Sequence, residues 1–383
     1  MTLRIAVFQD EWFPVHGGGL ISSLELCESL VDQHDIDIDI FTRQVRHEGE
    51  EYRTDENIHP NIRVVRLPPC TEPTNTLGKL SYFLTPLIYC PDQYDLVHAH
   101  TYIPGFPASM FGKLRDVPSV YTVRGTSVDA ESSVSSVSAG FVGRIKKRIE
   151  RFLVADVNYT TVISVNRDFT ERFGHCHDDV RFIPNGVDTE RFNADPPTDA
   201  TDFLFVGRLV GKKGVDVLLD AFESVHENRP EATLTIVGEG PLGDQLRETA
   251  SQNGLDDAVR FAGRVPYEEI PSYYEQADVF VLPSEWEGHP RVMIEAWSSS
   301  RPVLGTEIEG VEEFVEEGET GWLVPFDDSE RLAEQMIWCV DNPDAVEECG
   351  RNGREVAEAE YSWDAIADQT FDLYRELITN KED

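Results

Sequence analysis

The chain has 383 residues, of which 40% are hydrophobic and 27% charged; 71 acidic against 33 basic residues give a formal net charge of −38. This length and composition predict a globular protein with two domains and exclude a largely disordered chain. The acidic balance argues against nucleic acid as a partner, because the chain offers no broad cationic face to neutralise phosphates.

The charge also indicates the solvent in which the protein works. Only seven of the basic residues are lysine and 26 are arginine. At ordinary ionic strength such a charge weakens the compact state, whereas in molar salt the Debye length falls to about 3 Å and screens the repulsion. In this respect the chain resembles the cytoplasmic proteins of halophilic archaea. Without a signal segment, a long apolar run or a C-x-x-C pair, we expect a cytoplasmic protein with free thiols in high salt.

Short apolar strands alternate with helix-length segments along the chain. The strands predicted in the first half are "LRIAVFQ", "IDIDIFT", "IRVVRLP", "DLVHAH", "SVYTVRG", "TTVISV" and "VRFIPNG"; those in the second half are "DFLFVGR", "ATLTIVGEG", "VRFAGRV", "ADVFVLPS", "RPVLGTE" and "GWLVP". Helices are expected between them, for example over 214–228 and 327–341. This alternation predicts two doubly wound α/β domains with parallel sheets, divided in the Gly- and Pro-rich stretch 184–202.

A glycine-rich segment follows the first strand, at the edge of the sheet where parallel α/β domains bind ligands. In "WFPVHGGGLISS" three glycines open a helix whose N-terminus offers N–H groups to a phosphate. A tight turn in which glycines allow close packing is the alternative. An oxyanion hole of the α/β-hydrolase type, which "HGGG" also suggests, requires a G-x-S-x-G elbow that the chain lacks.

The second half carries two charged motifs at strand ends. "FVGRLVGKKGVD" places Arg208 after a strand and Lys213 before a helix, and two such cations would neutralise a diphosphate. "PSEWEGHPRVMIEA" places Glu287 in a loop and Glu295 about one turn into a helix whose first turn contains Pro290. Because the start of that helix attracts an anion, we expect the carboxylates to hold sugar hydroxyls on either side of a diphosphate. Acidic residues are abundant here, so each motif alone also fits a structural role.

Taken in order, these motifs resemble the retaining glycosyltransferases of family 4, which have the GT-B fold. The resemblance covers nearly the whole chain, through "DLVHAHT", "IPNGVDTERF", "GRLVGKKGVD", "VGEGP" and "SEWEGHPRVMIEA" to the last helix, "YSWDAIADQTFDLYREL". It implies two Rossmann-like domains facing a central cleft: 1–184 for the acceptor and 185–362 for a nucleotide-sugar, with the last helix, 363–383, packing back onto the first domain. It further implies a hexosyltransferase that acts with retention, without metal or cofactor, on a glycan or lipid-linked acceptor.

The resemblance also assigns roles to residues of the second domain. Arg208 and Lys213 would hold the donor diphosphate, Glu295 the ribose and Glu287 the transferred sugar, while the departing phosphate would accept the acceptor's proton. Further donor contacts are expected from Gly18, Gly19, Gly238, Val265, Gly288, His289, Pro290 and Arg291.

Candidate acceptor-side residues lie in the first domain. His100 is favoured as a catalytic residue over His98, whose position is more typical of packing in a strand. Arg124 stands in "YTVRGTS", where many family members carry a histidine. As a permanent cation it suits a carboxylated, sulfated or phosphorylated group, although a family variant with an ordinary substrate is equally compatible.

Two weaker signals and two other functions remain open. "GHCHDD" at 174–179 lacks the second ligand cluster of a zinc site and is interpreted as a surface loop. The basic segment 141–152, with Arg144, Lys146, Lys147, Arg148 and Arg151, is either an ordinary surface helix or a contact with the inner, anionic face of a membrane. A nucleotide-sugar epimerase and a non-catalytic nucleotide-sugar-binding module are the alternative functions on this fold.

Overall fold

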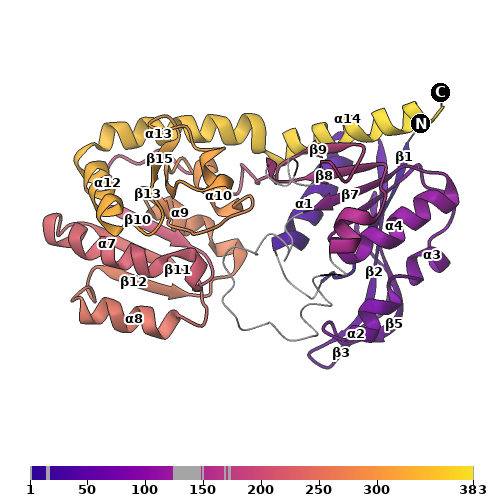
Figure 1. The fold of residues 1–383 in the computed structure, drawn as a ribbon, viewed down its shortest axis with the longest axis horizontal. Coiled ribbons are helices and arrows are strands. Elements are labelled where there is room, and N and C mark those ends of the chain that lie inside the picture. The colour runs from indigo at the N-terminus through magenta and orange to yellow at the C-terminus, as the bar shows by residue number, and fades with distance from the viewer. Residues whose placement is uncertain are drawn as a thin grey trace. The chain divides into compact units, whose positions relative to one another are not determined.

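The computed structural model describes residues 2–13, 18–123, 148, 151–167, 170 and 174–382. Its contacts divide the chain into two units, Met1–Asn185 with Ile366–Asp383, and Gly186–Ala365 (Figure 1). Each unit is a largely or wholly parallel sheet packed against helices, which confirms the predicted pair of Rossmann-like α/β domains. The division at Asn185 lies inside the Gly- and Pro-rich stretch.

The first unit has a nine-stranded sheet in the order β4-β5-β2-β1-β6-β7-β8-β9, with β3 paired to β2. The parallel register pairs Ile5 with both Ile38 and Leu96, so β1 lies between β2 and β6. The strands are β1 (Leu3–Phe8), β2 (Ile36–His47), β3 (Glu50–Tyr52), β4 (Glu56–His59), β5 (Ile62–Thr71), β6 (Leu96–His100), β7 (Ser119–Val123), β8 (Thr161–Ser164) and β9 (Val180–Phe182). The described helices include α1 (Gly18–Gln33), α2 (Thr76–Ser81), α3 (Thr85–Tyr89), α4 (Tyr102–Arg115) and the π-helical turn η2 (Phe152–Asp156).

Two strands of this sheet were not predicted, and both are antiparallel. β3 pairs with the end of β2, and β4 pairs with β5. Their sequences, EEY and ENIH, are short, polar and largely exposed, so they carry no apolar pattern that would distinguish them from loops. The expectation of a purely parallel first sheet is therefore wrong at this edge.

The second unit has a six-stranded parallel sheet in the order β12-β11-β10-β13-β14-β15. All six strands predicted in the second half are present: β10 (Asp202–Val206), β11 (Thr233–Val237), β12 (Val259–Gly263), β13 (Val279–Leu282), β14 (Val303–Thr306) and β15 (Gly321–Val324). The helices are α7 (Val215–Asn228), α8 (Gly243–Gln252), α9 (Pro271–Gln276), α10 (Arg291–Ser298), α11 (Glu309–Glu312), α12 (Ser329–Asp341) and α13 (Pro343–Val356), with short turns η3 (Gly211–Lys213), η4 (Tyr267–Glu269) and η5 (Ala357–Tyr361). The amphipathic α7 buries Leu218, Leu219, Phe222 and Val225, which fixes its face against the sheet.

The last helix, α14 (Trp363–Glu382), contributes its C-terminal part to the first unit. The hydroxyl of Tyr374 lies 2.5 Å from Nδ1 of His98, and Nε2 of His98 lies 2.7 Å from the Thr122 hydroxyl. All three side chains are buried. His98 therefore joins α14 to the sheet, in the packing role that its strand position indicates.

Replacing Tyr374 with phenylalanine is expected to lower the free energy of unfolding by about 1–3 kcal/mol, because a buried ring nitrogen of His98 loses a hydrogen-bonding partner. Chemical denaturation in concentrated KCl measures the change. Tyr89→Phe is the matched control. Tyr89 is 54% exposed, so water can take over any hydrogen bond that is lost with its hydroxyl. Equal losses in both variants would contradict a buried hydrogen bond at His98.

Candidate active site

The loop after β10 positions Lys213 beside the end of β13. Lys213 ends the turn η3, and Gly214 follows with a left-handed φ of 61°. A Cβ at Gly214 would lie 2.0 Å from the carbonyl oxygen of Pro283, so only glycine allows the two loops to approach this closely. The amide of Glu285 donates to the carbonyl of Lys212 at 2.9 Å and ties the loops together.

Glu287 is held by this arrangement at the carboxyl end of β13. Its Oε1 accepts hydrogen bonds from the ammonium of Lys213 and, at 2.6 Å, from the hydroxyl of Ser284. The side chains of Lys213 and Glu287 are only 16% and 10% exposed, so little solvent screens the pair. The carbonyl of Ser284 in turn accepts from the Thr306 hydroxyl at 2.6 Å. Oε2 of Glu287 has no partner among the described residues and could accept a ligand hydroxyl.

Glu295 has different surroundings from Glu287. It lies one turn into α10 and is 4% exposed. Its Oε1 is 3.4 Å from the hydroxyl of Tyr267 and 3.6 Å from a guanidinium nitrogen of Arg291, and its Oε2 is 3.3 Å from the hydroxyl of Tyr274. Burial raises the pKa of Glu295, and Arg291 and the two hydroxyls partly oppose this shift. These contacts are longer than the roughly 2.7 Å of a strong charge-assisted hydrogen bond, so the carboxylate is loosely held.

Arg208 is the second predicted cation of this site. It follows β10 by two residues, and its exposed side chain makes no ion pair or side-chain hydrogen bond with any residue in the part of the chain that the structure describes. In so acidic a chain, a cation without a countercharge at a strand end is suited to an anionic ligand.

The other predicted donor-site residues lie at the same carboxyl ends of strands. Gly238 follows β11 with a φ of 136°, and a Cβ there would lie 1.8 Å from the carbonyl of Gly207, so close packing alone also requires glycine. Val265 follows β12 and is partly buried. Pro290 precedes α10 as its N-cap, so the helix begins at Arg291 rather than at the proline.

His289 and the neighbouring Gly288 belong to the loop between β13 and α10. The ring of His289 is 8% exposed and packs edge-on against Phe314, with 4.7 Å between ring centroids. Its side chain therefore lies among aromatic residues. A Cβ at Gly310 would lie 2.2 Å from the carbonyl of Glu287, so that glycine also shapes the loop.

In the first unit, Gly18 and Gly19 begin α1, and His100 is the last residue of β6. His100 is 1% exposed, and its ring centroid lies 4.3 Å from that of His98. Arg124 lies outside the described residues, as do residues 127–140 and most of the basic segment 141–152. Among the residues that are described, including those of "GHCHDD", no group of three or more His, Cys, Asp or Glu is placed to hold a metal ion.

The sequence prediction missed a carboxylate in the first unit, Asp10. It follows β1, is 5% exposed, and accepts a hydrogen bond at 3.3 Å from the hydroxyl of Thr101. Burial and the neighbouring Glu11 raise its pKa to about 6, against the opposing effects of Arg43 and Lys79. Thr101 has a φ of 70° and a ψ of 166°, a region that residues other than glycine rarely adopt. A strained threonine thus holds its hydroxyl on a buried carboxylate at the ends of β1 and β6.

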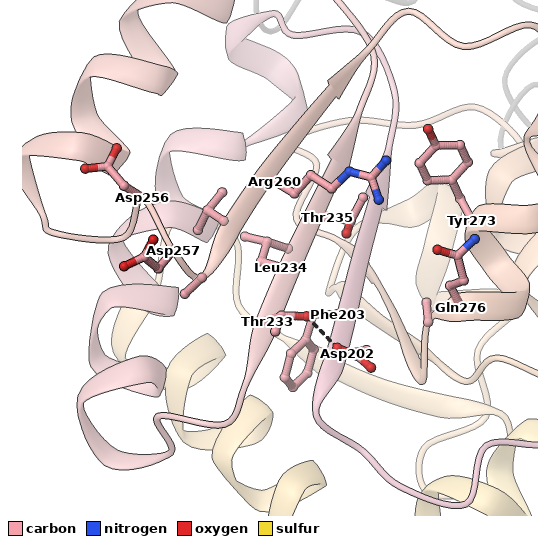
Figure 2. A pocket seen from close by; sticks show the side chains of 13 residues that line it. Asp202, Phe203, Thr233, Leu234, Thr235, Asp256, Asp257, Arg260, Tyr273 and Gln276 are labelled. Atoms are coloured by element: carbon pink, nitrogen blue, oxygen red, sulfur yellow. Dashed lines mark hydrogen bonds between the residues drawn. The ribbon is translucent and has the colours of Figure 1, made fainter.

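A cavity of about 610 Å³ lies elsewhere in the second unit. Figure 2 shows that Thr235, Arg260, Tyr273 and Gln276 line it together with the first residues of β10 and β11. These are the amino ends of the strands, whereas Lys213 and Glu287 lie at the carboxyl ends. The cavity is therefore separate from the candidate active site.

Comparison with known proteins agrees with this geometry. Residues 16–191 match the family described as Glycosyltransferase Family 4, and residues 186–356 match Glycosyl transferases group 1. Glycogen synthase of Mycobacterium tuberculosis is 32% identical over 285 residues, which cover 73% of this chain and 68% of that protein. Sucrose-phosphate synthase of Thermosynechococcus elongatus superposes with a TM-score of 0.81 at 25% identity, covering 99% and 100% of the two chains. The Anabaena protein HepE, solved with UDP, superposes with a TM-score of 0.74 at 18% identity, covering 98% of this chain and 100% of that chain.

The fold and these relatives define the class of protein, a glycosyltransferase enzyme with the GT-B fold. The chain belongs to the family 4, or group 1, glycosyltransferases.

Proposed function

We propose that the protein transfers a hexosyl group from a nucleotide-sugar to a glycan or lipid-linked acceptor, with retention at the anomeric carbon and without a metal ion. The observation that carries this proposal is the group at the carboxyl ends of β10 and β13: Arg208, which pairs with no described residue, and Lys213, paired with a Glu287 whose Oε2 has no partner among the described residues. Two cations in the loop after β10, one of them paired with a carboxylate that can accept from a hydroxyl, fit a sugar diphosphate. HepE, which shares the fold, was solved with UDP.

In this proposal Arg208 and Lys213 bind the diphosphate, Oε2 of Glu287 accepts from a hydroxyl of the transferred sugar, and Glu295 accepts from the ribose hydroxyls. During transfer, the bond between the anomeric carbon and the phosphate oxygen breaks as the acceptor oxygen bonds to the same face of that carbon. The acceptor's proton passes to the departing phosphate. The two cations stabilise the negative charge that develops there, which is the task a metal ion would otherwise perform.

In this proposal Asp10 and Thr101 contact the acceptor. A carboxylate has about four lone-pair positions, and among the described residues only Thr101 hydrogen-bonds to that of Asp10. Its remaining capacity suits an acceptor hydroxyl. The roles of His100 and Arg124 stay predictions, as do a high-salt cytoplasm and a membrane contact through 141–152.

Thermal unfolding in concentrated KCl with UDP, GDP, ADP or dTDP tests the donor site. A nucleotide at about 100 times its Kd should add roughly 2.7 kcal/mol to the stability of the wild type. The shift should shrink in Arg208→Ala and persist in Lys212→Ala, whose side chain instead lies 5.0 Å over the ring of Trp286. A shift that survives the loss of Arg208 and Lys213 together would place the nucleotide elsewhere. Interconversion of the donor sugar without an acceptor would favour an epimerase instead.

A further inference from the structure

The segment formed by α2 and α3 presents large apolar side chains to solvent. In the described part of the chain ten large hydrophobic side chains are exposed, and five of them belong to this segment, inside a stretch of 13 residues. We call these five the leucine face: Leu77 (74% exposed), Leu80 (55%), Leu84 (61%), Ile88 (70%) and Tyr89 (54%). Exposed apolar side chains gathered in this way mark an interaction surface more often than single ones do.

Packing of the fold does not account for the leucine face. The same segment has an inward side, made of Gly78, Tyr82, Pro86 and Cys90, which recur every four residues and are all buried. Phe83 and Leu87 also pack against the core of the first unit. The segment thus buries one apolar side already, and its outward side would ordinarily be polar.

The charges of this segment set it apart from the rest of the chain. Residues 73–91 contain no acidic residue and a single basic one, Lys79, in a protein with 71 acids. Lys79 pairs with Glu11 at 2.9 Å, so the segment is fixed beside Asp10. A surface without carboxylates does not repel the anionic headgroups of a membrane, whereas most of this protein's surface does.

We propose that the leucine face docks on the surface of a lipid bilayer, with its five side chains inserted at the boundary between headgroups and acyl chains. Leucine, isoleucine and tyrosine suit that depth. A stable protein–protein interface uses roughly 20 residues from each partner. The leucine face offers five side chains on two short helices, which argues against a second copy of this chain as the binding partner. No helix among the described residues is both long and apolar enough to cross a bilayer.

Docking in this way would present the Asp10 side of the first unit to an acceptor carried by a lipid. The presentation of Asp10 to an acceptor rests on the proposed function, whereas the docking of the leucine face on a bilayer is independent of it. It also differs from an electrostatic contact through 141–152, because apolar insertion persists in concentrated salt and attraction between charges does not.

Flotation with vesicles of phosphatidylcholine and phosphatidylglycerol, at about 0.1 M and about 2 M KCl, tests the proposal. The variant combines Leu77→Gln, Leu80→Gln, Leu84→Gln and Ile88→Gln. Its matched control is Leu114→Gln, another leucine of the first unit that is 63% exposed. The wild type and the control should float at both salt concentrations, and the fourfold variant should show about tenfold less vesicle-bound protein, since binding scales with inserted apolar area.

Three results would overturn the proposal. The first is a wild type that does not float. The second is flotation that survives in the fourfold variant but is lost when the five basic residues of 141–152 become glutamine. The third is light scattering that shows a wild-type dimer, which the fourfold variant converts to a monomer, without flotation of either. The nucleotide-induced thermal shift of the fourfold variant, measured in parallel, separates a failure of docking from a failure of the donor site and reports that the variant is folded.

Discussion

Replacing Lys213 with alanine is expected to lower kcat by about 10²- to 10³-fold, the usual cost of removing one group that stabilises developing negative charge. Lys213 forms an ion pair with Glu287, and with Arg208 it would balance the charge of the departing diphosphate. Because that charge grows during the reaction, kcat should fall more than donor affinity. Release of the nucleoside diphosphate, from whichever donor the thermal-shift screen selects, measures the effect.

Lys212→Ala is the matched control, since the neighbouring lysine is exposed and turns toward Trp286. It should retain activity within about twofold, as surface substitutions generally do. Lys213→Ala should also lose stability, because Glu287 stays mostly buried without its countercharge; comparison at a temperature where both variants are folded separates the two effects. An unchanged kcat in folded Lys213→Ala would remove this residue from the reaction.

Replacing Asp10 with asparagine is expected to stabilise the protein while impairing transfer. The pKa of Asp10 is raised from 3.8 to about 6, so ionising this carboxyl group costs more in the folded than in the unfolded state. At about 1.4 kcal/mol per pKa unit, the cost at pH 7 is up to about 3 kcal/mol, and asparagine avoids it. The free energy of unfolding should therefore rise by about 1–3 kcal/mol, while KM for the acceptor rises roughly tenfold as a hydroxyl contact is lost.

The direction in which stability changes with pH tests whether the raised pKa of Asp10 causes the effect. In the wild type the folded state holds this proton more tightly, so stability falls as the pH rises from about 4 to about 6 and the cost is constant above. The gain in unfolding free energy of Asp10→Asn over the wild type should accordingly be absent near pH 4, grow between pH 4 and 6, and stay constant above pH 6. Asp35→Asn, at an exposed position of the same unit, should change stability by less than about 0.5 kcal/mol. A destabilised Asp10→Asn would show that the carboxylate serves the fold instead.

Most of the fold could be predicted because its parallel strands are buried and apolar. All six strands of the second sheet carry such runs, and α7 and α12 begin within two residues of the predicted helices. β3 and β4 were not predicted, because they form by pairing with neighbouring strands and their own residues carry no strand pattern. Local pattern is informative only where burial dictates residue type.

The sequence names residues of the candidate site, whose roles stay predictions, but it does not give their contacts. The pairing of Lys213 with Glu287 joins positions 74 residues apart, which no spacing rule reveals. Tyr267 and Tyr274 reach Glu295 from 28 and 21 residues upstream, on elements that carry no motif. Ser284 and Asp10 could have been found from the sequence, because each follows the end of a strand. Ser284 lies three residues before Glu287, and Asp10 lies two residues after β1.

The bond between His98 and Tyr374 has a consequence for synthesis. These partners are 276 residues apart, and the whole second unit lies between them in the chain. A ribosome therefore delivers the second unit before the helix that completes the first, reversing the usual order in which N-terminal domains finish folding first. During that interval the surface around His98 is uncovered, so chaperones and proteases should meet the nascent first unit longer than the second.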